Sequence, residues 1–454
     1  MTLRLTVFTA VLAALALAEQ TALDRYVAKP DPSFKWKLAG SIPCEGCTAQ
    51  VLDMVSQNWR KPDEVSRTEW QHWVTVIRPE KVVSPIAVLF ITGGSNNGRP
   101  PTRADGMLSA IAKEIQAVAV ELRMVPNQPV RFPGDTRDRT EDSIIAYTWD
   151  KFLRGGDEEW PLRLPMTKAA VRAMDAVTAF AKSPEGGGIT VDRFIVSGGS
   201  KRGWTTWTTG AVDKRVVAIA PLVIDCLNLE KSMMHHWRAY GFWAPAVGDY
   251  TAARIMDWMG SKENKALLKI EEPFEYRDRL TMPKYIVNAS GDQFFLPDSS
   301  QFYFKELKGE KLLRYVPNAD HSLRNSDAPF GLTAFLQSVV SGKARPRYSW
   351  QVGKDGAIRV KTQDAPTEVR LWQASNPEAR DFRLQTIGAK WKSEKIEAVD
   401  GVYVGRAPRP EKGFTAYFVE LTYPAGKYPL KLTTDVKVVP DIYPHAAPKF
   451  EKPR

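Results

Sequence analysis

The chain has 454 residues, of which 43% are hydrophobic and 25% are charged, so its composition is that of a globular protein long enough for two or three domains. Its formal net charge is +11, but the 63 Lys and Arg residues are dispersed and are not interleaved with aromatic residues in one segment. This distribution argues against nucleic-acid binding and leaves an affinity for acidic substrates or surfaces open.

The first 18 residues have the pattern of a secretory signal peptide. Arg4 supplies a basic start, residues 5–17 are apolar, and Ala16-Leu17-Ala18 is a small-x-small cleavage site. The apolar run is shorter than the roughly 20 residues that span a bilayer, and no other stretch is long and apolar enough to do so. We therefore expect cleavage after Ala18 and a soluble mature protein, secreted or periplasmic, without a membrane span.

Three cysteines are few for an exported protein of this length. Cys44 and Cys47 can close a small disulfide in an oxidising compartment, which leaves Cys226 free. A redox C-x-x-C is disfavoured because no strand–helix–strand pattern surrounds it, and a zinc site is disfavoured because no further ligands cluster there. The sequence also has no nucleotide-binding loop, so we expect neither a metal nor a cofactor.

Strands and helices alternate through the first half of the chain. In chain order the pattern predicts a strand at 69–77, a buried strand at 86–91, a helix at 106–115, a strand at 117–122, a helix at 143–152 and a crossover helix at 166–180. This alternation predicts an α/β fold with a mostly parallel sheet covered by helices on both faces.

The buried strand at 86–91 ends in a glycine-rich loop that contains Gly94 and Ser95. Hydrolases with a serine elbow further along the chain place one oxyanion-hole N–H in such a loop. The loop therefore supplies a candidate donor if the elbow is real, and a plain turn is the alternative.

A second buried strand at 194–196 runs into a glycine-rich turn and then a helix. Gly198 and Gly199 allow a sharp turn that lifts Ser200 clear of the sheet, which is the geometry of a nucleophile elbow. The spacing is G-x-S-x-x-G rather than G-x-S-x-G, because Arg202 occupies the usual second glycine position and Gly203 follows it. A glycine turn with an incidental serine is the alternative interpretation.

The second half of the chain continues the alternation around a helical insertion. The pattern predicts a strand at 216–224, a helical and aromatic cap at about 230–275, a strand at 284–289, a helix at 299–307, a strand at 311–316 and a helix at 330–340. The aromatic residues of the cap line a substrate cleft or pack the cap against the body, and the sequence favours neither.

Five histidines are candidates for a general base, and an α/β-hydrolase keeps the chain order serine, acid, histidine. They are His72, His235, His236, His321 and His445. Only His321 follows both a candidate acid and a predicted sheet strand, whereas the first three come too early and the last lies in a proline-rich tail. Elimination and placement therefore both indicate His321.

Asp292 is the preferred acid because it lies in a loop at the carboxyl end of a predicted strand, where catalytic groups collect in open α/β sheets. Asp298 and Asp320 are its rivals, although Asp298 also suits a helix N-cap and Asp320 adjoins the histidine. In this scheme His321 takes the proton of Ser200, and Asp292 holds the imidazole tautomer and stabilises the imidazolium.

From about residue 346 the sequence pattern changes to short runs of alternating apolar and polar residues separated by turns. This predicts an Ig-like β-sandwich at 346–440, after an α/β-hydrolase-like domain at 19–345, with a flexible tail at 441–454. Such a module packs against the catalytic body or binds glycan through exposed aromatic residues.

Several motifs together resemble the PhoPQ-activated pathogenicity-related family of secreted α/β-hydrolase-like proteins. The matching stretches are Val125-Pro126-Asn127-Gln128-Pro129, Glu141-Asp142, Thr148-Trp149, Pro165-Met166-Thr167-Lys168, Gly199-Ser200-Lys201-Arg202-Gly203-Trp204, Gly291-Asp292, Asp298-Ser299, Pro317-Asn318, His321-Ser322-Leu323 and Arg380-Asp381-Phe382-Arg383. The resemblance implies an α/β-hydrolase fold with a serine triad at Ser200, Asp292 and His321. It implies no particular substrate.

The elbow also resembles that of glucuronoyl esterases, where a basic residue follows the serine as Lys201 does here. That analogy makes a carbohydrate ester a candidate substrate, although it rests on few residues.

We therefore predict an exported serine hydrolase that cleaves an ester, or less readily an amide or peptide bond, through an acyl-enzyme. The oxyanion donors are the N–H of Lys201 and one from Gly94 or Ser95, and Arg202 and Trp204 are candidate substrate-binding residues, the former for a carboxylate. The substrate is of ester or peptide type, acidic or carbohydrate-linked. The alternative is a catalytically silent secreted factor that uses the scaffold for binding or signalling, which the unusual Arg202 favours.

Overall fold

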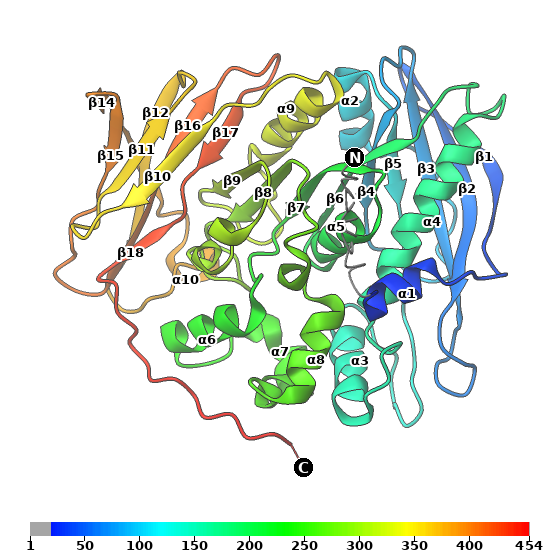
Figure 1. The fold of residues 1–454 in the computed structure, drawn as a ribbon, viewed down its shortest axis with the longest axis horizontal. Helices are drawn as coiled ribbons and strands as arrows, with labels where there is room; N and C mark the ends of the chain where they lie inside the picture. The colour runs from blue at the N-terminus through cyan, green and yellow to red at the C-terminus, as the bar shows by residue number, and fades with distance from the viewer. Residues whose placement is uncertain (1–19, 454) are drawn as a thin grey trace, which may run out of the picture.

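The computed structural model describes residues 20–453 of the chain (Figure 1). The predicted signal peptide lies outside the described residues. Within the described part of the chain, no helix has the length and apolar character that a membrane span requires.

A nine-stranded sheet forms the centre of the molecule, with the strand order β1-β2-β3-β5-β4-β6-β7-β8-β9. Its strands are β1 (Lys35–Ile42), β2 (Cys47–Asn58), β3 (Glu69–Pro79), β4 (Ile86–Ile91), β5 (Ala119–Leu122), β6 (Arg193–Gly199), β7 (Val216–Leu222), β8 (Lys284–Ala289) and β9 (Lys311–Val316). The pairs from β5 to β9 are parallel, whereas β1, β2 and β3 join antiparallel at one edge. This is the α/β-hydrolase fold predicted from the sequence.

Helices cover both faces of this sheet. They are α1 (Ala22–Ala28), α4 (Arg163–Ala181) and α5 (Lys201–Val212) on one face, and α2 (Gly106–Ile115) and α9 (Ala328–Val340) on the other. The strand β4 shows why helices are needed on both faces, because successive side chains of a strand point to opposite faces of the sheet. Leu89 and Ile91 join the core of α4 and α5, while Val88 joins that of α2 and α9.

A cap of short helices lies at the carboxyl edge of the parallel strands (Figure 1). Its elements are α6 (Leu229–Tyr240), α7 (Gly248–Ala252) and α8 (Lys262–Glu271), with the short 3₁₀ helices η1 (Pro245–Val247), η2 (Ile255–Trp258) and η3 (Pro273–Tyr276). The body helix α3 (Asp142–Gly155) packs against α7, α8 and η2. The helix predicted at 299–307 is instead two 3₁₀ turns, η4 (Ser299–Phe302) and η5 (Phe304–Glu306).

Two antiparallel sheets make a β-sandwich at the C-terminal end. One has the order β10-β11-β15-β14, and the other has the order β13-β12-β16-β17, with β18 paired to β16. Their elements are β10 (Tyr348–Val352), β11 (Ile358–Thr362), β12 (Glu368–Asn376), α10 (Leu384–Ile387), β13 (Lys392–Lys395), β14 (Ala398–Val399), β15 (Val402–Gly405), β16 (Phe414–Tyr423), β17 (Leu430–Thr433) and β18 (Lys437–Val439). Apolar side chains of β11, β12 and β16 share one core with the body.

After β18 the described part of the tail runs along the cap (Figure 1). The N–H of His445 donates to the carbonyl of Arg238 on α6 at 3.1 Å, and Lys452 pairs with Glu263 on α8 at 2.7 Å. The tail therefore joins the β-sandwich to both ends of the cap.

Candidate active site

Ser200 lies at a sharp turn between β6 and α5. Its backbone has φ 58° and ψ −125°, a conformation that costs a residue with a side chain on the order of 1–3 kcal/mol. The N–H of Ser200 donates to the carbonyl of Leu222 on the neighbouring strand at 2.9 Å, which fixes the turn to the sheet. Because α5 begins at Lys201, the N–H of that residue has no partner within the helix.

Close packing explains the unusual spacing of the glycines. A Cβ at Gly203 would lie 2.8 Å from the carbonyl oxygen of Leu222 and 3.0 Å from that of Gly198, both of them backbone atoms. A Cβ at Gly198 would lie 2.9 Å from Cβ of Arg202. In this elbow the glycine that packs closely against β7 is therefore Gly203, three residues after the serine. The position two residues after the serine holds the side chain of Arg202.

The two basic residues after the serine converge on Glu141. Arg202 donates from Nη1 and Nη2 to the two carboxylate oxygens at 2.8 and 2.7 Å, and from Nε to the carbonyl of Val125 at 2.5 Å. Lys201 Nζ lies 2.8 Å from Glu141 Oε2 and 3.2 Å from Asp142 Oδ2. Burial alone would raise the pKa of Glu141, but the hydrogen bonds and charges of the two cations lower it to about 2.

Gln128 ties the glycine-rich loop after β4 to the same carboxylate. Its Nε2 donates to the carbonyl of Gly94 at 3.0 Å and to Glu141 Oε1 at 2.6 Å, and its Oε1 accepts the N–H of Glu141 at 2.7 Å. The loop that holds Gly94 and Ser95 is thus fixed relative to the elbow. Neither Gln128 nor Glu141 carries a functional prediction from sequence, although both stand in the motif stretches quoted above.

His321 and Asp292 meet at the ends of β9 and β8. Nδ1 of His321 lies 2.7 Å from Oδ2 of Asp292, whose Oδ1 accepts the N–H groups of Phe294 at 2.7 Å and Phe295 at 3.3 Å. The carboxylate is only 3% exposed. The other ring nitrogen, Nε2, is buried and has no hydrogen-bond partner, so it does not bond to Ser200 Oγ here. Catalytic bonds of this kind often tighten only when substrate binds.

The two rival acids have other partners. Asp298 lies 2.8 Å from Nε2 of His235 and 2.6 Å from Nη2 of Arg380, and its side chain does not cap the helix that follows. Asp320 accepts the N–H and hydroxyl of Ser322 at 2.9 and 2.6 Å. Of the three candidate carboxylates, Asp292 is the one that contacts His321.

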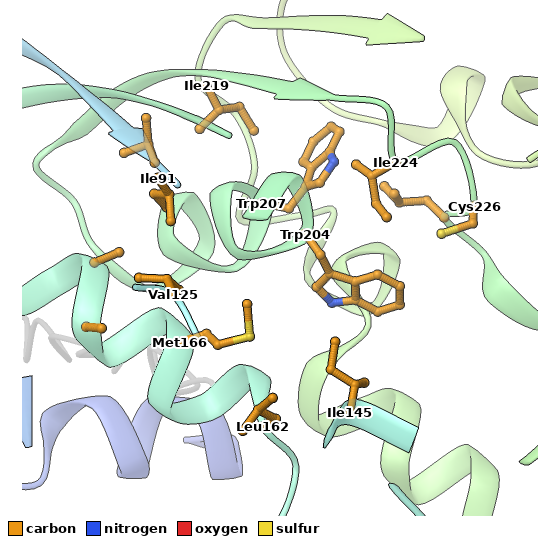
Figure 2. Packing of buried hydrophobic residues seen from close by; sticks show 14 of the residues in the cluster. Ile91, Val125, Ile145, Leu162, Met166, Trp204, Trp207, Ile219, Ile224 and Cys226 are labelled. Carbon is orange, nitrogen blue, oxygen red and sulfur yellow. The ribbon is translucent and has the colours of Figure 1, made fainter. Parts of the chain in front are cut away.

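A narrow cavity of about 70 Å³ opens beside Ser200, between the elbow and the cap. Its lining comprises Asp142, Trp149, Arg163, Ser200, Lys201, Trp204, Ile224, Cys226, Leu229, Glu230, Met233, Val247, Tyr250, Ile255, Met256, Met259, Asn264, Phe294 and Phe295. Trp204 extends from α5 toward Ile145, with Ile224 and Cys226 on the adjoining loop (Figure 2).

The cavity thus includes Ser200, Lys201 and Trp204 from the predicted site, whereas His321, Asp292, Arg202, Gly94 and Ser95 lie outside its lining. Its aromatic cap residue Tyr250 lines the cleft, and others such as Trp243 pack against the body core. Tyr250 also packs against that core, so both interpretations of the cap aromatics apply.

A disulfide joins Cys44 and Cys47, and Cys226 is a buried free thiol. Among residues 20–453, no group of three or more His, Cys, Asp or Glu side chains is arranged to hold a metal ion.

Similarity to known proteins covers most of the chain. The family described as PhoPQ-activated pathogenicity-related protein matches residues 23–383. Autocrine proliferation repressor protein A of Dictyostelium discoideum is 37% identical over 455 residues, which make up 93% of this chain and 91% of that protein.

Solved structures of similar shape include hydrolases. An acetyl xylan esterase from Paenibacillus sp. R4 has a TM-score of 0.49 at 14% identity, over 71% of this chain and 92% of that one. A Mycobacterium tuberculosis puromycin-hydrolyzing peptidase has a TM-score of 0.38 at 15% identity, over 69% of this chain and 47% of that one.

Proposed function

The chain belongs to the PhoPQ-activated pathogenicity-related protein family, and we propose that it is an exported serine hydrolase that cleaves an ester through Ser200, His321 and Asp292. The observation that carries this proposal is the 2.7 Å contact between His321 and Asp292 in a fold whose strained elbow sets Ser200 at the wall of a cavity. Three separate loops at the carboxyl edge of one parallel sheet supply these groups, which is where such sheets bind ligands.

In the proposed reaction, Ser200 Oγ attacks the ester carbonyl carbon while His321 Nε2 removes its proton. Asp292 accepts the hydrogen bond of Nδ1–H and so fixes the tautomer that leaves Nε2 free to act as a base. The tetrahedral intermediate collapses when the alcohol leaves with the proton from His321. Water then attacks the acyl-enzyme by the same proton route and releases the acid.

The oxyanion of each tetrahedral intermediate is assigned to the N–H of Lys201 and to one N–H from Gly94 or Ser95. The first is an orphan donor at the start of α5, where the helix dipole also favours negative charge. The second comes from the loop that Gln128 ties to the elbow. Lys201 adds a full positive charge at the cavity wall, although Glu141 and Asp142 offset it.

Arg202 has a positioning role in this proposal, since its guanidinium donates to both carboxylate oxygens of Glu141 and to the carbonyl of Val125. A substrate carboxylate, the ligand predicted for it from sequence, would have to use the remaining N–H of Nη1 and Nη2 or displace Glu141. An ester is preferred over an amide or a peptide, because the amine of an amide must be protonated before it can leave. Export rests on the predicted signal peptide.

Labelling of the mature protein with a fluorophosphonate probe tests the proposal directly. Labelling is expected for the wild type, and it is expected to disappear in Ser200→Ala. The matched control is Ser341→Ala, which removes an exposed hydroxyl at the end of α9 and should label as the wild type does. Labelling that persists in Ser200→Ala, or fails in a folded wild type, would contradict the proposal.

A second candidate function is a secreted signalling factor that uses the hydrolase scaffold without catalysis. Two observations favour it: the 37% identical relative is named as an autocrine proliferation repressor, and His321 Nε2 lacks a bond to the serine. A folded wild type that takes no fluorophosphonate label, yet binds cells at a saturable site, would support this candidate instead.

A further inference from the structure

The cavity beside Ser200 contains a buried cation that the proposed mechanism does not use. Arg163 is the first residue of α4 and is 2% exposed. Its guanidinium lies 3.8 Å from the ring centroid of Trp204 and 5.8 Å from that of Trp149. Both rings line the same cavity, so the cation is held in place by stacking against its walls.

Arg163 is short of hydrogen-bond acceptors. Its nearest carboxylate is that of Glu271, and the distance from Nη1 to Oε1 is 3.5 Å, longer than a charge-assisted hydrogen bond. Both Nε and Nη1 of Arg163 are buried without a hydrogen-bond partner. Leaving a buried charged donor unpaired costs free energy, so an acceptor that reached this guanidinium would bind favourably.

The other charged groups on the cavity wall are already satisfied. Asp142 receives the hydroxyl of Tyr250 at 3.0 Å and the ammonium of Lys201 at 3.2 Å. Glu230 accepts from Asn264 Nδ2 at 2.7 Å and from the N–H of Gly260 at 2.8 Å. Among the charged lining residues, Arg163 is therefore the one whose buried polar atoms lack hydrogen-bond partners.

Glu271 compensates that charge incompletely. Its Oε1 also accepts the indole N–H of Trp149, and its other oxygen has no hydrogen-bond partner. Burial raises the pKa of Glu271 to about 7, although Arg163 and Trp149 oppose the rise. A carboxylate near Arg163 would therefore meet a guanidinium whose charge Glu271 offsets only in part, on a cavity wall that also carries Lys201, Asp142 and Glu230.

The rest of the cavity fits a short apolar chain. Three methionines, Met233, Met256 and Met259, line it from the cap, and a thioether side chain adapts to guests of different shape. The cavity holds only about 70 Å³, so it accepts a small group and the larger part of the substrate must remain outside. The small group is therefore assigned to the acyl side, which stays on Ser200 after the alcohol leaves.

We propose that Arg163 determines specificity by binding a carboxylate at the far end of the acyl group, so that the preferred substrates are half-esters of short dicarboxylic acids. This inference rests on the proposed hydrolase function and names the acyl group that the same site takes. Arg163 contacts neither the scissile carbonyl nor the leaving alcohol in this scheme. It selects the acid part of the ester.

The test compares esters of one fluorescent phenol, 4-methylumbelliferone. Half-esters of succinate, glutarate and adipate are paired with the neutral butyrate, pentanoate and hexanoate of the same chain lengths, and non-enzymatic hydrolysis is subtracted. For at least one length, kcat/KM of the wild type should favour the half-ester by tenfold or more. A preference for the neutral ester at every length would overturn the proposal without any variant.

Arg163→Gln should remove this preference by lowering kcat/KM of the half-ester tenfold or more, while the neutral ester changes less than about threefold. Arg163→Lys keeps the cation and should retain part of the preference, which also covers a failure of the glutamine variant to fold. Arg172→Gln is the matched control, because it removes another stacked guanidinium from α4 away from the cavity. Equal losses on both esters in Arg163→Gln would assign Arg163 a structural role and overturn the proposal.

Binding to Ser200→Ala separates this inference from the proposed function. Calorimetry should detect the favoured half-ester, and the signal should be lost when Arg163→Gln is added. If the wild type takes no fluorophosphonate label but this binding persists, the hydrolase proposal fails and the anion site stands. If labelling occurs and no dicarboxylate half-ester binds at any length, the hydrolase stands and the anion site is wrong.

Discussion

Glu141 is the residue on which both cations of the elbow converge, although it lies on a different segment from the serine. Its backbone has φ 51° and ψ −125°, nearly the conformation of Ser200 itself. Glu141 and Ser200 both have strained backbones, and the ion pairs of Lys201 and Arg202 with Glu141 link the two segments. These ion pairs fix the elbow and account for an arginine two positions after the serine, where glycine is more usual.

The low pKa of Glu141 predicts a pH dependence of stability. The folded value of about 2 lies below the unfolded value, so the ionised carboxylate stabilises the fold above about pH 4.3, and this stabilisation is lost as the pH falls toward 2. The urea midpoint of the wild type should therefore fall more steeply between pH 5 and 2.5 than that of Glu141→Gln. Glu158→Gln, at an exposed ion pair, should parallel the wild type. Parallel curves for Glu141→Gln would contradict the prediction.

Asp292 is expected to act through the tautomer of His321. An amide in Asp292→Asn would offer an N–H toward Nδ1, so Nε2 would carry the proton and could not serve as a base. The rate of fluorophosphonate labelling should drop by about 10³-fold or more, as large an effect as such substitutions have in other triads. Asp320→Asn, which alters a rival carboxylate bonded to Ser322, should remain within about twofold. The reverse order of effects would move the acid to Asp320.

At the scale of elements, the elbow consists of β6 and α5, and both pack against the neighbouring strand β7. The apolar runs at 86–91 and 194–196 predicted β4 and β6, and small residues that recur on one face predicted α4. The prediction failed at η4 and η5, where a single helix was expected. There Tyr303 turns out of helical geometry at φ −140°, and its hydroxyl donates to Asp225 at 2.6 Å, a partner 78 residues away.

Gly203 is predicted to be intolerant of a side chain. In Gly203→Ala the new Cβ would lie 2.8 Å from the carbonyl oxygen of Leu222, so α5 must move away from β7. The free energy of unfolding should fall by about 1–3 kcal/mol, and labelling of Ser200 should slow with it. Gly106→Ala, at the open first position of α2, is the control and should be neutral or slightly stabilising. An unchanged urea midpoint for Gly203→Ala would refute the crowding argument.

The candidate site also contains residues that the sequence predicted and residues that it did not. Chain order and strand ends led to the prediction of Ser200, Asp292 and His321, because topology alone brings the ends of parallel strands to one edge. The partners of Arg202 and the identity of Arg163 as a cavity residue could not be predicted. Both depend on segments that meet only after folding, Glu141 being 61 residues before Arg202.

At the scale of the whole molecule, one buried carboxylate connects three parts of the chain. Asp298, in the loop after β8, contacts His235 of the cap and Arg380 of the β-sandwich. Nδ1 of His235 lies 2.9 Å from the hydroxyl of Tyr443 in the tail. Arg380 and Asp298 are both 3% exposed, so their pair is poorly screened by solvent and salt.

Removal of residues 441–454 should loosen the cap. The truncated chain would lose Tyr443 at His235 and Lys452 at Glu263, so α6 and α8 should open more often. Amide hydrogen exchange should rise in both helices by about tenfold or more while α9 stays as in the full chain. Unchanged protection in α6 would show that the tail does not fasten the cap.

The route of the tail also orders events during synthesis. A ribosome delivers Ser200, Asp292 and His321 well before Arg380, and Tyr443 and Lys452 come last. A nascent chain can therefore form the central sheet before the tail residues that contact the cap have been synthesised. The contacts that Tyr443 and Lys452 make with the cap therefore form only after the rest of the chain has been synthesised.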